Sequence, residues 1–200
     1  MPGSTEFAEI SYTLTDCIVA AYNKTANTYG VPAALANGQI VEIEAEADND
    51  QLRGYGKKTA LLSVAVGAKI KVGAGGVDSN VVAIWSGSTN ATSGTTPNQV
   101  RTMKFPAGGA GLPYWGIIGT AATDDGGLKI VGLQCCKLDT HPKYTLDGKE
   151  NKFNVSETDG YAIPIDISSV SYLMVVKDVE TASAWVAPLV GANFLNFFTS

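Results

Sequence analysis

The sequence predicts a mainly β protein that is assembled from antiparallel hairpins. Apolar and polar residues alternate over two long stretches, 39–47 and 60–72, which is the period of a half-buried strand. Gly, Val, Ile and Thr are abundant, and stretches with the longer period of a helix are few. The chain has 200 residues, of which 45% are hydrophobic. This is enough for one sizeable core, so we expect a single domain over residues 1–200.

The two long strands form a hairpin whose faces differ in chemistry. One face of the first strand is apolar, and the other carries Glu42, Glu44 and Glu46. The second strand alternates an apolar face with a face that includes Lys69 and Lys71. If these lysines share the carboxylate face, cross-strand pairs worth about 0.2 to 1 kcal/mol each would neutralise part of it. The alternative without a specific function is that these three carboxylates form a solvent-exposed face of the strand.

The segment that joins these strands, residues 48–59, is too long for a two-residue turn. We therefore expect a long projecting hairpin loop. Such a loop either contacts a partner or is a mobile tip without a role, and the residues alone leave both open.

Shorter signals predict the remaining elements. Asp78 or Ser79 and then Gly87 bound a short helix that runs to Trp85. A Gly-rich turn at 124–127 divides 114–138 into a second hairpin. Further strands are expected at 17–22, 101–105, 152–157, 161–165 and 172–176, with a polar surface excursion at 86–98.

The two ends of the chain differ in composition. Residues 1–16 form an N-terminal arm that adds to another surface, or a frayed terminus. Residues 185–200 form an apolar C-terminal tail rich in aromatic side chains. Exposed aromatics are costly in a free monomer, so this tail should dock on its own domain or on a neighbour.

Motifs for catalysis or for metal binding are scarce. His141 is the single histidine, which excludes multi-histidine zinc sites, and no Gly-x-Ser-x-Gly elbow accompanies it. Gly56-Lys-Lys-Thr59 lacks the first glycine of a phosphate-binding loop. The adjacent Cys135 and Cys136 lack the spacing of redox or zinc sites, and we expect three reduced thiols. We therefore expect no enzyme, no catalytic residues, no cofactor and no metal.

Charge and hydropathy narrow the class of partner. The net charge of -5 argues against general attraction to nucleic acid or to an anionic membrane. No stretch has the apolar length of a transmembrane helix. The first six residues lack the basic region of a secretory signal, so we expect none.

Several segments between residues 28 and 166 occur in a recognisable order. They are Thr28-Tyr-Gly-Val-Pro-Ala-Ala-Leu35, the glutamate strand 39–47, Leu52-Arg-Gly-Tyr-Gly56, the strand 60–72, Leu112-Pro-Tyr-Trp-Gly-Ile-Ile-Gly-Thr120, the strand 128–138 and Asp159-Gly-Tyr-Ala-Ile-Pro164. Their order and spacing resemble those of the major tail tube proteins of long-tailed (siphovirus-like) phages. The Gly-rich segment 106–111 and the aromatic C-terminal tail depart from that pattern.

The resemblance implies an antiparallel two-sheet β-sandwich or barrel with a helix at 79–85 on its flank. It also implies hexameric rings that stack into a hollow tube for DNA passage. The hairpin strands would form the inner wall, with Glu42, Glu44, Glu46, Lys69 and Lys71 facing the lumen. The loop 48–59 would contact the next ring, through Asp48, Asp50, Arg53, Tyr55, Lys57 and Lys58.

The same resemblance implies the partners and the location of the protein. The partners are further copies of the chain, tail tip or initiator proteins and tail terminator proteins. The tape measure protein and DNA occupy the lumen transiently, and no membrane is bound. The chain would reside in the tail of the virion, after assembly in the cytoplasm of the host bacterium.

Charge on the hairpin fits such a channel. Six copies in a ring would turn the three glutamates into rings of carboxylates around a water-filled bore. DNA carries about one negative charge per 1.7 Å of axis, so a wall of like charge would keep it from sticking. Screening limits this repulsion to about 8 Å at physiological salt.

Two other classes of function remain open from sequence. One is a monomeric or trimeric binding module, such as a head-decoration or carbohydrate-binding domain, with an aromatic platform built from Trp85, Tyr114 and Trp115. The other is an enzyme, for which His141 is the one acid-base candidate.

Overall fold

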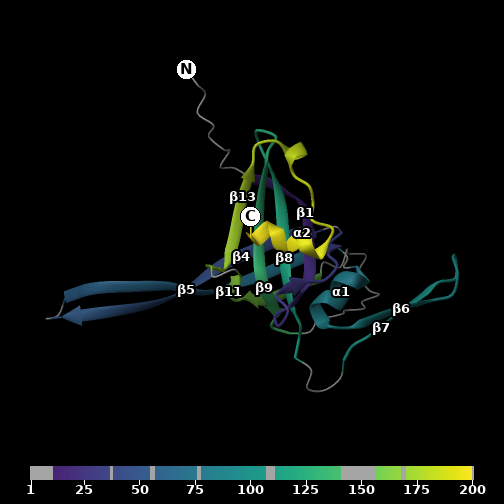
Figure 1. Cartoon of the computed structure of the whole chain (residues 1–200), viewed down its shortest axis with the longest axis horizontal. Coiled ribbons are helices and arrows are strands. Elements are labelled where there is room, and N and C mark those ends of the chain that lie inside the picture. Colours follow the sequence, from purple (N-terminus) through teal and green to yellow (C-terminus); the bar gives the residue numbers. More distant parts are fainter. Residues whose placement is uncertain are drawn as a thin grey trace, which may run out of the picture.

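The computed structural model describes residues 11–36, 38–54, 57–75, 78–106, 111–140, 156–167 and 170–199. Over these residues the protein is mainly β, and each strand pairing is antiparallel (Figure 1). The strands are β1 (Ser11–Asn23), β2 (Thr28–Tyr29), β3 (Ala33–Ala34), β4 (Gly38–Gly54), β5 (Lys57–Ala74), β6 (Thr89–Ser93), β7 (Val100–Lys104), β8 (Tyr114–Thr123), β9 (Leu128–Leu138), β10 (Ser156–Ala162), β11 (Ile165–Ile167), β12 (Val170–Tyr172) and β13 (Met174–Val179). The helices are α1 (Ser79–Ser86) and α2 (Gly191–Thr199), with a short 3-10 turn at Ala182–Ala184.

One large sheet organises the described residues. Its strand order is β2-β1-β8-β9-β10-β5-β4, and β3 and β13 add to β1 and β9. One edge of β9 is shared, because β13 pairs with its first half and β10 with its last three residues. β2 and β4 end the path without pairing to each other, so the sheet stays open and the barrel alternative is wrong. β6–β7 and β11–β12 form two separate ribbons.

The central strands bury side chains on both faces. Along β1, Cys17 and Val19 belong to one apolar cluster, whereas Ile18 and Ala20 belong to the other. The first core lies between β1-β8-β9 and the strands β5 and β10, with α1 closing one end. Side chains therefore cover both faces of these strands, as a continuous apolar run predicts.

The helix α1 begins and ends at the capping residues that the sequence predicts. The carboxylate of Asp78 accepts a hydrogen bond from the backbone N–H of Asn80 at 2.7 Å. Gly87 has a φ of 69°, and its N–H donates to the carbonyl of Ala83 at 2.8 Å. Between these caps, Trp85 packs on Trp115 of β8 with ring centroids 5.7 Å apart. The predicted helix is confirmed, and it anchors the first core.

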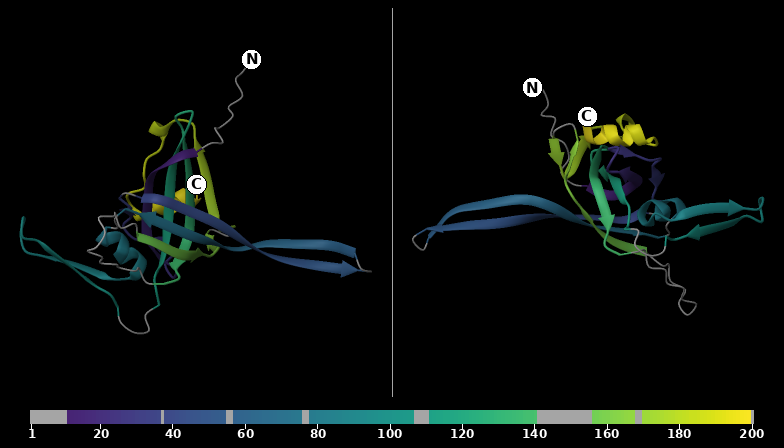
Figure 2. Two further views of the ribbon diagram at one scale, coloured as in Figure 1. Left: turned by 180° about the vertical axis from the view of Figure 1, so that it is seen from behind. Right: turned by 60° about the horizontal axis from the view of Figure 1, so that its bottom comes forward.

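The second core is closed by the C-terminal segment, which docks on its own domain. Phe194, Phe197 and Phe198 of α2 are buried against β9 and β2. Figure 2 shows α2 on one side of β8 and β9 and the β4–β5 hairpin on the other. Gly132 of β9 makes room for α2, because a Cβ there would collide with the rings of Phe197 and Phe198.

The expected loop at 48–59 is wrong. β4 continues to Gly54 and β5 begins at Lys57, so the two strands stay paired far beyond the body of the protein (Figure 1). Tyr55 and Gly56 lie outside the described residues. The polar Asp-Asn-Asp sequence disfavours a strand on its own, but ladder pairing with β5 overrides this weak preference.

Other expected boundaries shift for the same reason. β1 extends over 11–23, because it pairs with β8 along nearly its whole length, so 11–16 belong to a strand and not to an arm. Residues 1–10 lie outside the described residues. Of the expected strand at 152–157, residues 152–155 lie outside the described residues, and β10 begins at Ser156. The expected strand at 161–165 is divided between the end of β10 and the start of β11, with Pro164 between them. Residues 172–176 are divided between β12 and β13.

Candidate functional site

Two rows of side chains cross the outer face of β4, β5 and β10. The first row is Glu42, Lys71 and Asp159, and the second row is Glu44, Lys69 and Tyr161. Residues directly opposite each other in a ladder point to the same face of the sheet. The lysines therefore share the face of the glutamates, and we call these six residues the acidic face.

One ion pair on this surface is diagonal. The ammonium of Lys69 lies 2.7 Å from Oε1 of Glu46, one pair further along β4. The hydrogen bond from Lys69 to Glu46 and the attraction between their charges raise the pKa of Lys69. A shift in the ladder follows directly, between Glu46 and Ala47. The ion pair between Lys69 and Glu46 therefore lies next to this shift, where the hairpin leaves the body of the protein.

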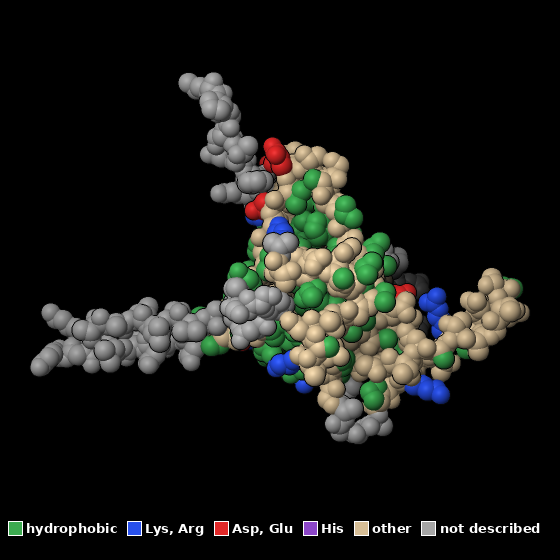
Figure 3. Space-filling model, viewed as in Figure 1, with side chains coloured by type: hydrophobic (Ala, Val, Ile, Leu, Met, Phe, Trp, Pro, Cys, Tyr) green, Lys and Arg blue, Asp and Glu red, His purple; other side chains and the backbone are tan. Residues whose placement is uncertain are grey.

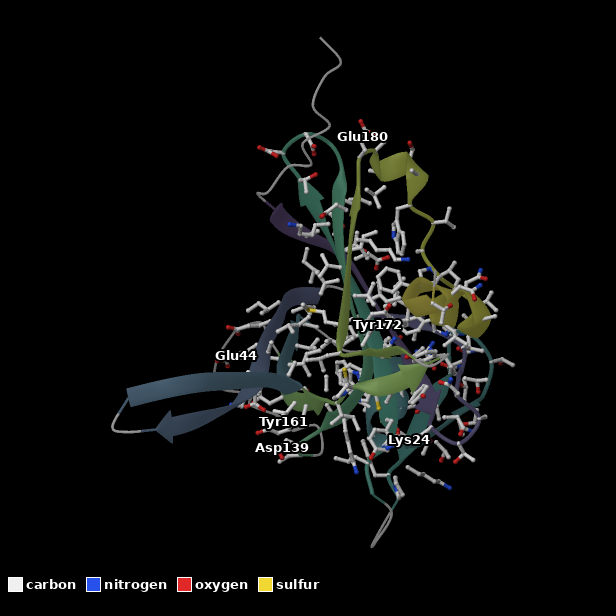
Figure 4. All side chains as sticks on the ribbon, turned by 60° about the vertical axis from the view of Figure 1, so that its left-hand side comes forward. Lys24, Glu44, Asp139, Tyr161, Tyr172 and Glu180 are labelled. Carbon is white, nitrogen blue, oxygen red and sulfur yellow. The ribbon has the colours of Figure 1, made fainter. Side chains whose placement is uncertain are left out.

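A shallow pocket of about 360 Å³ lies on this face. Its charged lining consists of four carboxylates and two lysines, so its net charge is negative: Glu42, Glu44, Asp139, Asp159, Lys69 and Lys71. Figure 4 shows Glu44, Asp139 and Tyr161 together at the base of the β4–β5 hairpin, away from Lys24 and Glu180. This arrangement suits contact with water and ions, or with a polymer that must not adhere. That the face lines a lumen stays a prediction.

Charge is unevenly distributed over the molecule. The view in Figure 3 is mostly hydrophobic and uncharged, with Lys and Arg side chains near the β6–β7 hairpin. That hairpin contributes Arg101 and Lys104, and no acidic residue occurs between Asp78 and Asp124. The negative charges of the acidic face therefore lie on a different part of the fold.

The residues expected to contact the next ring lie in the projecting part of the hairpin. Tyr55 is outside the described residues. The other five are strand residues, of which the backbone alone is described: Asp48, Asp50, Arg53, Lys57 and Lys58. Their role in a contact stays a prediction.

An open, mostly apolar groove lies beside β4, which is the last strand of the sheet among the described residues, and sequence analysis missed it. It has a volume of about 450 Å³. Its lining comes from β1, β4, β8, β9 and β13 and is mostly apolar, with Thr120 and Lys129 as polar members: Leu14, Val41, Ile43, Gly119, Thr120, Ala121, Lys129, Val131, Met174 and Val176. Met174 and Val176 are 40% and 47% exposed. We call this the edge groove. The apolar run 172–176 predicts a buried strand, and this is wrong for burial, because Met174 and Val176 lie on an uncovered face of β13.

The aromatic platform expected for a binding module is wrong for both tryptophans. Trp85 and Trp115 are 2% and 1% exposed, because both fill the first core. Tyr114 is half-buried, and the ammonium groups of Lys24 and Lys137 lie 5.5 and 5.2 Å from its ring centroid. His141, the candidate for the enzyme alternative, lies outside the described residues.

The cysteines are buried and reduced. Cys17, Cys135 and Cys136 form no disulfide, in agreement with the expected thiols. In the part of the chain that the structure describes, no three His, Cys, Asp or Glu side chains come together as metal ligands do. Nor does any described helix have the length and hydropathy to span a membrane.

Comparison with known proteins adds no family to this description. No protein-family model matches the chain, and no curated protein matches it.

Proposed function

We propose that this chain is a structural subunit of a phage tail tube, which forms stacked hexameric rings around a channel for DNA passage and has no catalytic role. The observation that carries the proposal is the β4–β5 hairpin. It extends from the body as a paired ribbon, and its base carries a face with more carboxylates than lysines. An isolated two-stranded ribbon has marginal stability in water, so a neighbouring molecule is the natural support for it.

The architecture suits a ring subunit. We describe it for this purpose as a sandwich, with β1, β8, β9 and β13 in one layer and β10, β5 and β4 in the other. Among the described residues, β4 and β13 each have a neighbouring strand on one side only. Neighbours in a ring would cover such edges, which otherwise invite uncontrolled association.

In the proposed tube, the acidic face lines the bore. Lys69 and Lys71 reduce its charge but leave it negative, because carboxylates outnumber lysines four to two in its pocket. The projecting hairpin makes contacts between rings through the residues from Asp48 to Lys58. The remaining partners are tail tip and terminator proteins at the ends, with the tape measure protein and DNA in the lumen.

The test is the mass of the purified protein in solution as a function of its concentration. Light scattering after gel filtration should show hexamers or larger multiples of the subunit. A monomer or a trimer at each concentration would instead favour the binding-module class. Tail tip components are added in a parallel sample, because tube growth can require an initiator.

A further inference from the structure

We propose that the two ends of the β8–β9 hairpin join successive copies of the chain, so that the acidic end of one copy binds the basic end of the next. This inference rests on the proposed self-assembly and names a contact between stacked rings, besides the one proposed for the β4–β5 hairpin. The basic end consists of Lys24, Tyr114 and Lys137, and the acidic end consists of Asp124, Asp125 and Glu180.

The basic end gathers two positive charges around one aromatic ring. Tyr114 is the first residue of β8, and the ammonium groups of Lys24 and Lys137 lie 5.5 and 5.2 Å from its ring centroid. Neither ammonium forms a salt bridge with another described residue. Two like charges that share a ring repel each other, and a carboxylate from outside would relieve this repulsion. The chemistry of this end therefore suits an acidic partner.

The acidic end lies at the other end of the same strands. Asp124 and Asp125 occupy the turn between β8 and β9, and Glu180 follows β13. The chain after Glu180 lies against that turn, because the N–H of Ala182 donates to the carbonyl of Gly126 at 3.3 Å. The side chains of all three acidic residues are exposed. Three carboxylates thus gather at one exposed tip of the protein.

Two lysines near this tip have contacts within their own copy. The ammonium of Lys129 lies 3.8 Å from the carboxylate of Asp178, so these two charges cancel. The ammonium of Lys177 lies 4.8 Å from the ring centroid of Phe197. Even when Lys177 is counted, the acidic end keeps a net negative charge.

The two ends are too far apart to neutralise each other within one copy. β8 has 10 residues, so the strand separates them by about 30 Å. Charges are screened over about 8 Å at physiological salt. Figure 4 shows Glu180 and Lys24 at opposite ends of the protein. Each end therefore finds its complement on another copy.

The contact dictates how copies are arranged. Its two sides are different surfaces of one chain, so it is heterologous and repeats along an axis without stopping at a twofold dimer. A single exposed ion pair contributes little to stability. Six subunits of one ring would present six such contacts to the next ring at once, and their effects multiply. Because the acidic face lies away from both ends (Figure 4), it stays open to the lumen.

Charge reversal tests each end separately. Lys24→Glu combined with Lys137→Glu reverses the basic end, and Asp124→Lys combined with Glu180→Lys reverses the acidic end. Each double variant should raise the protein concentration needed for tubes roughly tenfold or more, because attraction between rings becomes repulsion. Circular dichroism confirms that each variant is folded.

The matched control makes the same change of charge elsewhere on the surface. Arg101→Glu combined with Lys104→Glu places it on the exposed β6–β7 hairpin, away from both ends of β8. This control should form tubes at the concentration that the wild-type protein needs.

A variant with all four reversals tests whether the two ends bind each other. Its ends are again complementary, with the signs exchanged, so it should form tubes near the wild-type concentration. A purely structural role of these side chains would not be rescued in this way.

Salt tests the contact in the unmodified protein. Raising the salt concentration from about 0.1 to 1 M shortens the screening length from about 10 to 3 Å. Tubes of the wild-type protein should then separate into rings. Tubes that stay intact at high salt would overturn the inference.

The outcomes separate this inference from the proposed function. A wild-type protein that never assembles contradicts the proposed function, and the contact with it. Tubes formed by either double variant at the wild-type concentration overturn the contact alone. If both double variants stop at rings but the folded fourfold variant does so as well, then the two ends do not bind each other.

Discussion

The ammonium of Lys69 lies 2.7 Å from the carboxylate of Glu46, although the residue directly opposite Lys69 in the ladder is Glu44. The diagonal contact places Lys69 between two carboxylates of β4. It raises the pKa of Lys69, chiefly through the hydrogen bond from Lys69 to Glu46. The carboxylates of Glu46 and Glu44 thus stabilise the protonated form of Lys69.

Glu46→Gln should move the pKa of Lys69 back toward its ordinary value, because the amide keeps an acceptor but loses the charge. A titration of the lysine side chains by NMR measures this. Glu42→Gln is the control, since Glu42 lies opposite Lys71 and should leave Lys69 unchanged. An unchanged pKa of Lys69 in Glu46→Gln would show that the contact is not formed in solution.

Gly132→Ala should destabilise the protein by about 1–3 kcal/mol, because the added methyl group overpacks the contact with α2. At this position a Cβ would lie 2.8 Å from the ring of Phe198 and closer still to Phe197. Gly119→Ala is the matched control, because its nearest neighbour is Leu14 at an ordinary 3.7 Å. Urea unfolding of both variants measures the difference, and equal stabilities would refute the close packing of α2 on β9.

Gln134→Met should stabilise the protein by about 1–2 kcal/mol. Gln134 is fully buried, and neither polar atom of its amide has a hydrogen-bond partner among the described residues. Its backbone carbonyl is satisfied by the hydroxyl of Tyr29, which donates at 2.7 Å. Thermal unfolding compares Gln134→Met with the exposed control Gln99→Met. A lower melting temperature for Gln134→Met alone would reveal a partner for the amide.

The buried thiols should make the fold less stable in alkali. Burial, with a contribution from Asp16, raises the pKa of Cys17 to about 12, and burial raises the pKa of Cys135 to about 11. The folded state therefore retains protons that the unfolded state releases above a pKa of 9.0. The contribution of these thiols to stability is constant below that pH, and it falls by about 1 kcal/mol per pH unit per thiol as pH rises toward the folded pKa.

Urea unfolding between pH 8 and pH 10.5 measures this slope. Cys17→Ala should be less stable at neutral pH, because it leaves a small cavity, but its stability should fall less steeply with pH. A slope equal to that of the wild-type protein would show that Cys17 is not protonated by burial.

Periodic patterns with local caps were predicted well. The alternation over 39–47 and 60–72, the caps Asp78 and Gly87 and the turn at 124–127 each depend on a few neighbouring residues. The structure confirms a hairpin, a helix and a second hairpin at these positions. Physical preferences that act within one element are therefore readable from sequence.

Features that depend on distant pairing were missed. The polar residues after Ala47 join a strand because β5 lies beside them. β6 is also polar, so it gave no periodic signal, although it pairs with β7 over its whole length. The helix α2 had a usable signal, because Phe194, Phe197 and Phe198 follow helical spacing, but the segment was predicted only as an apolar tail.

Of the two candidate surfaces, the acidic face was considered from sequence and the edge groove was not. The register places Lys69 and Lys71 beside the glutamates, which sequence analysis considered. The edge groove was missed, because Leu14, Val131 and Val176 are far apart in sequence and are joined only by the sheet. Trp85 and Trp115 are buried where α1 packs against β8, and the apolar neighbours of both residues in sequence already favoured the core over a binding platform.

Negative-stain electron microscopy of the purified protein tests the central claim, self-assembly into a tube, most directly. Rings or tubes with an open bore are the predicted result. A monodisperse monomer at each protein concentration, with tail tip components present as well as without them, would contradict the account.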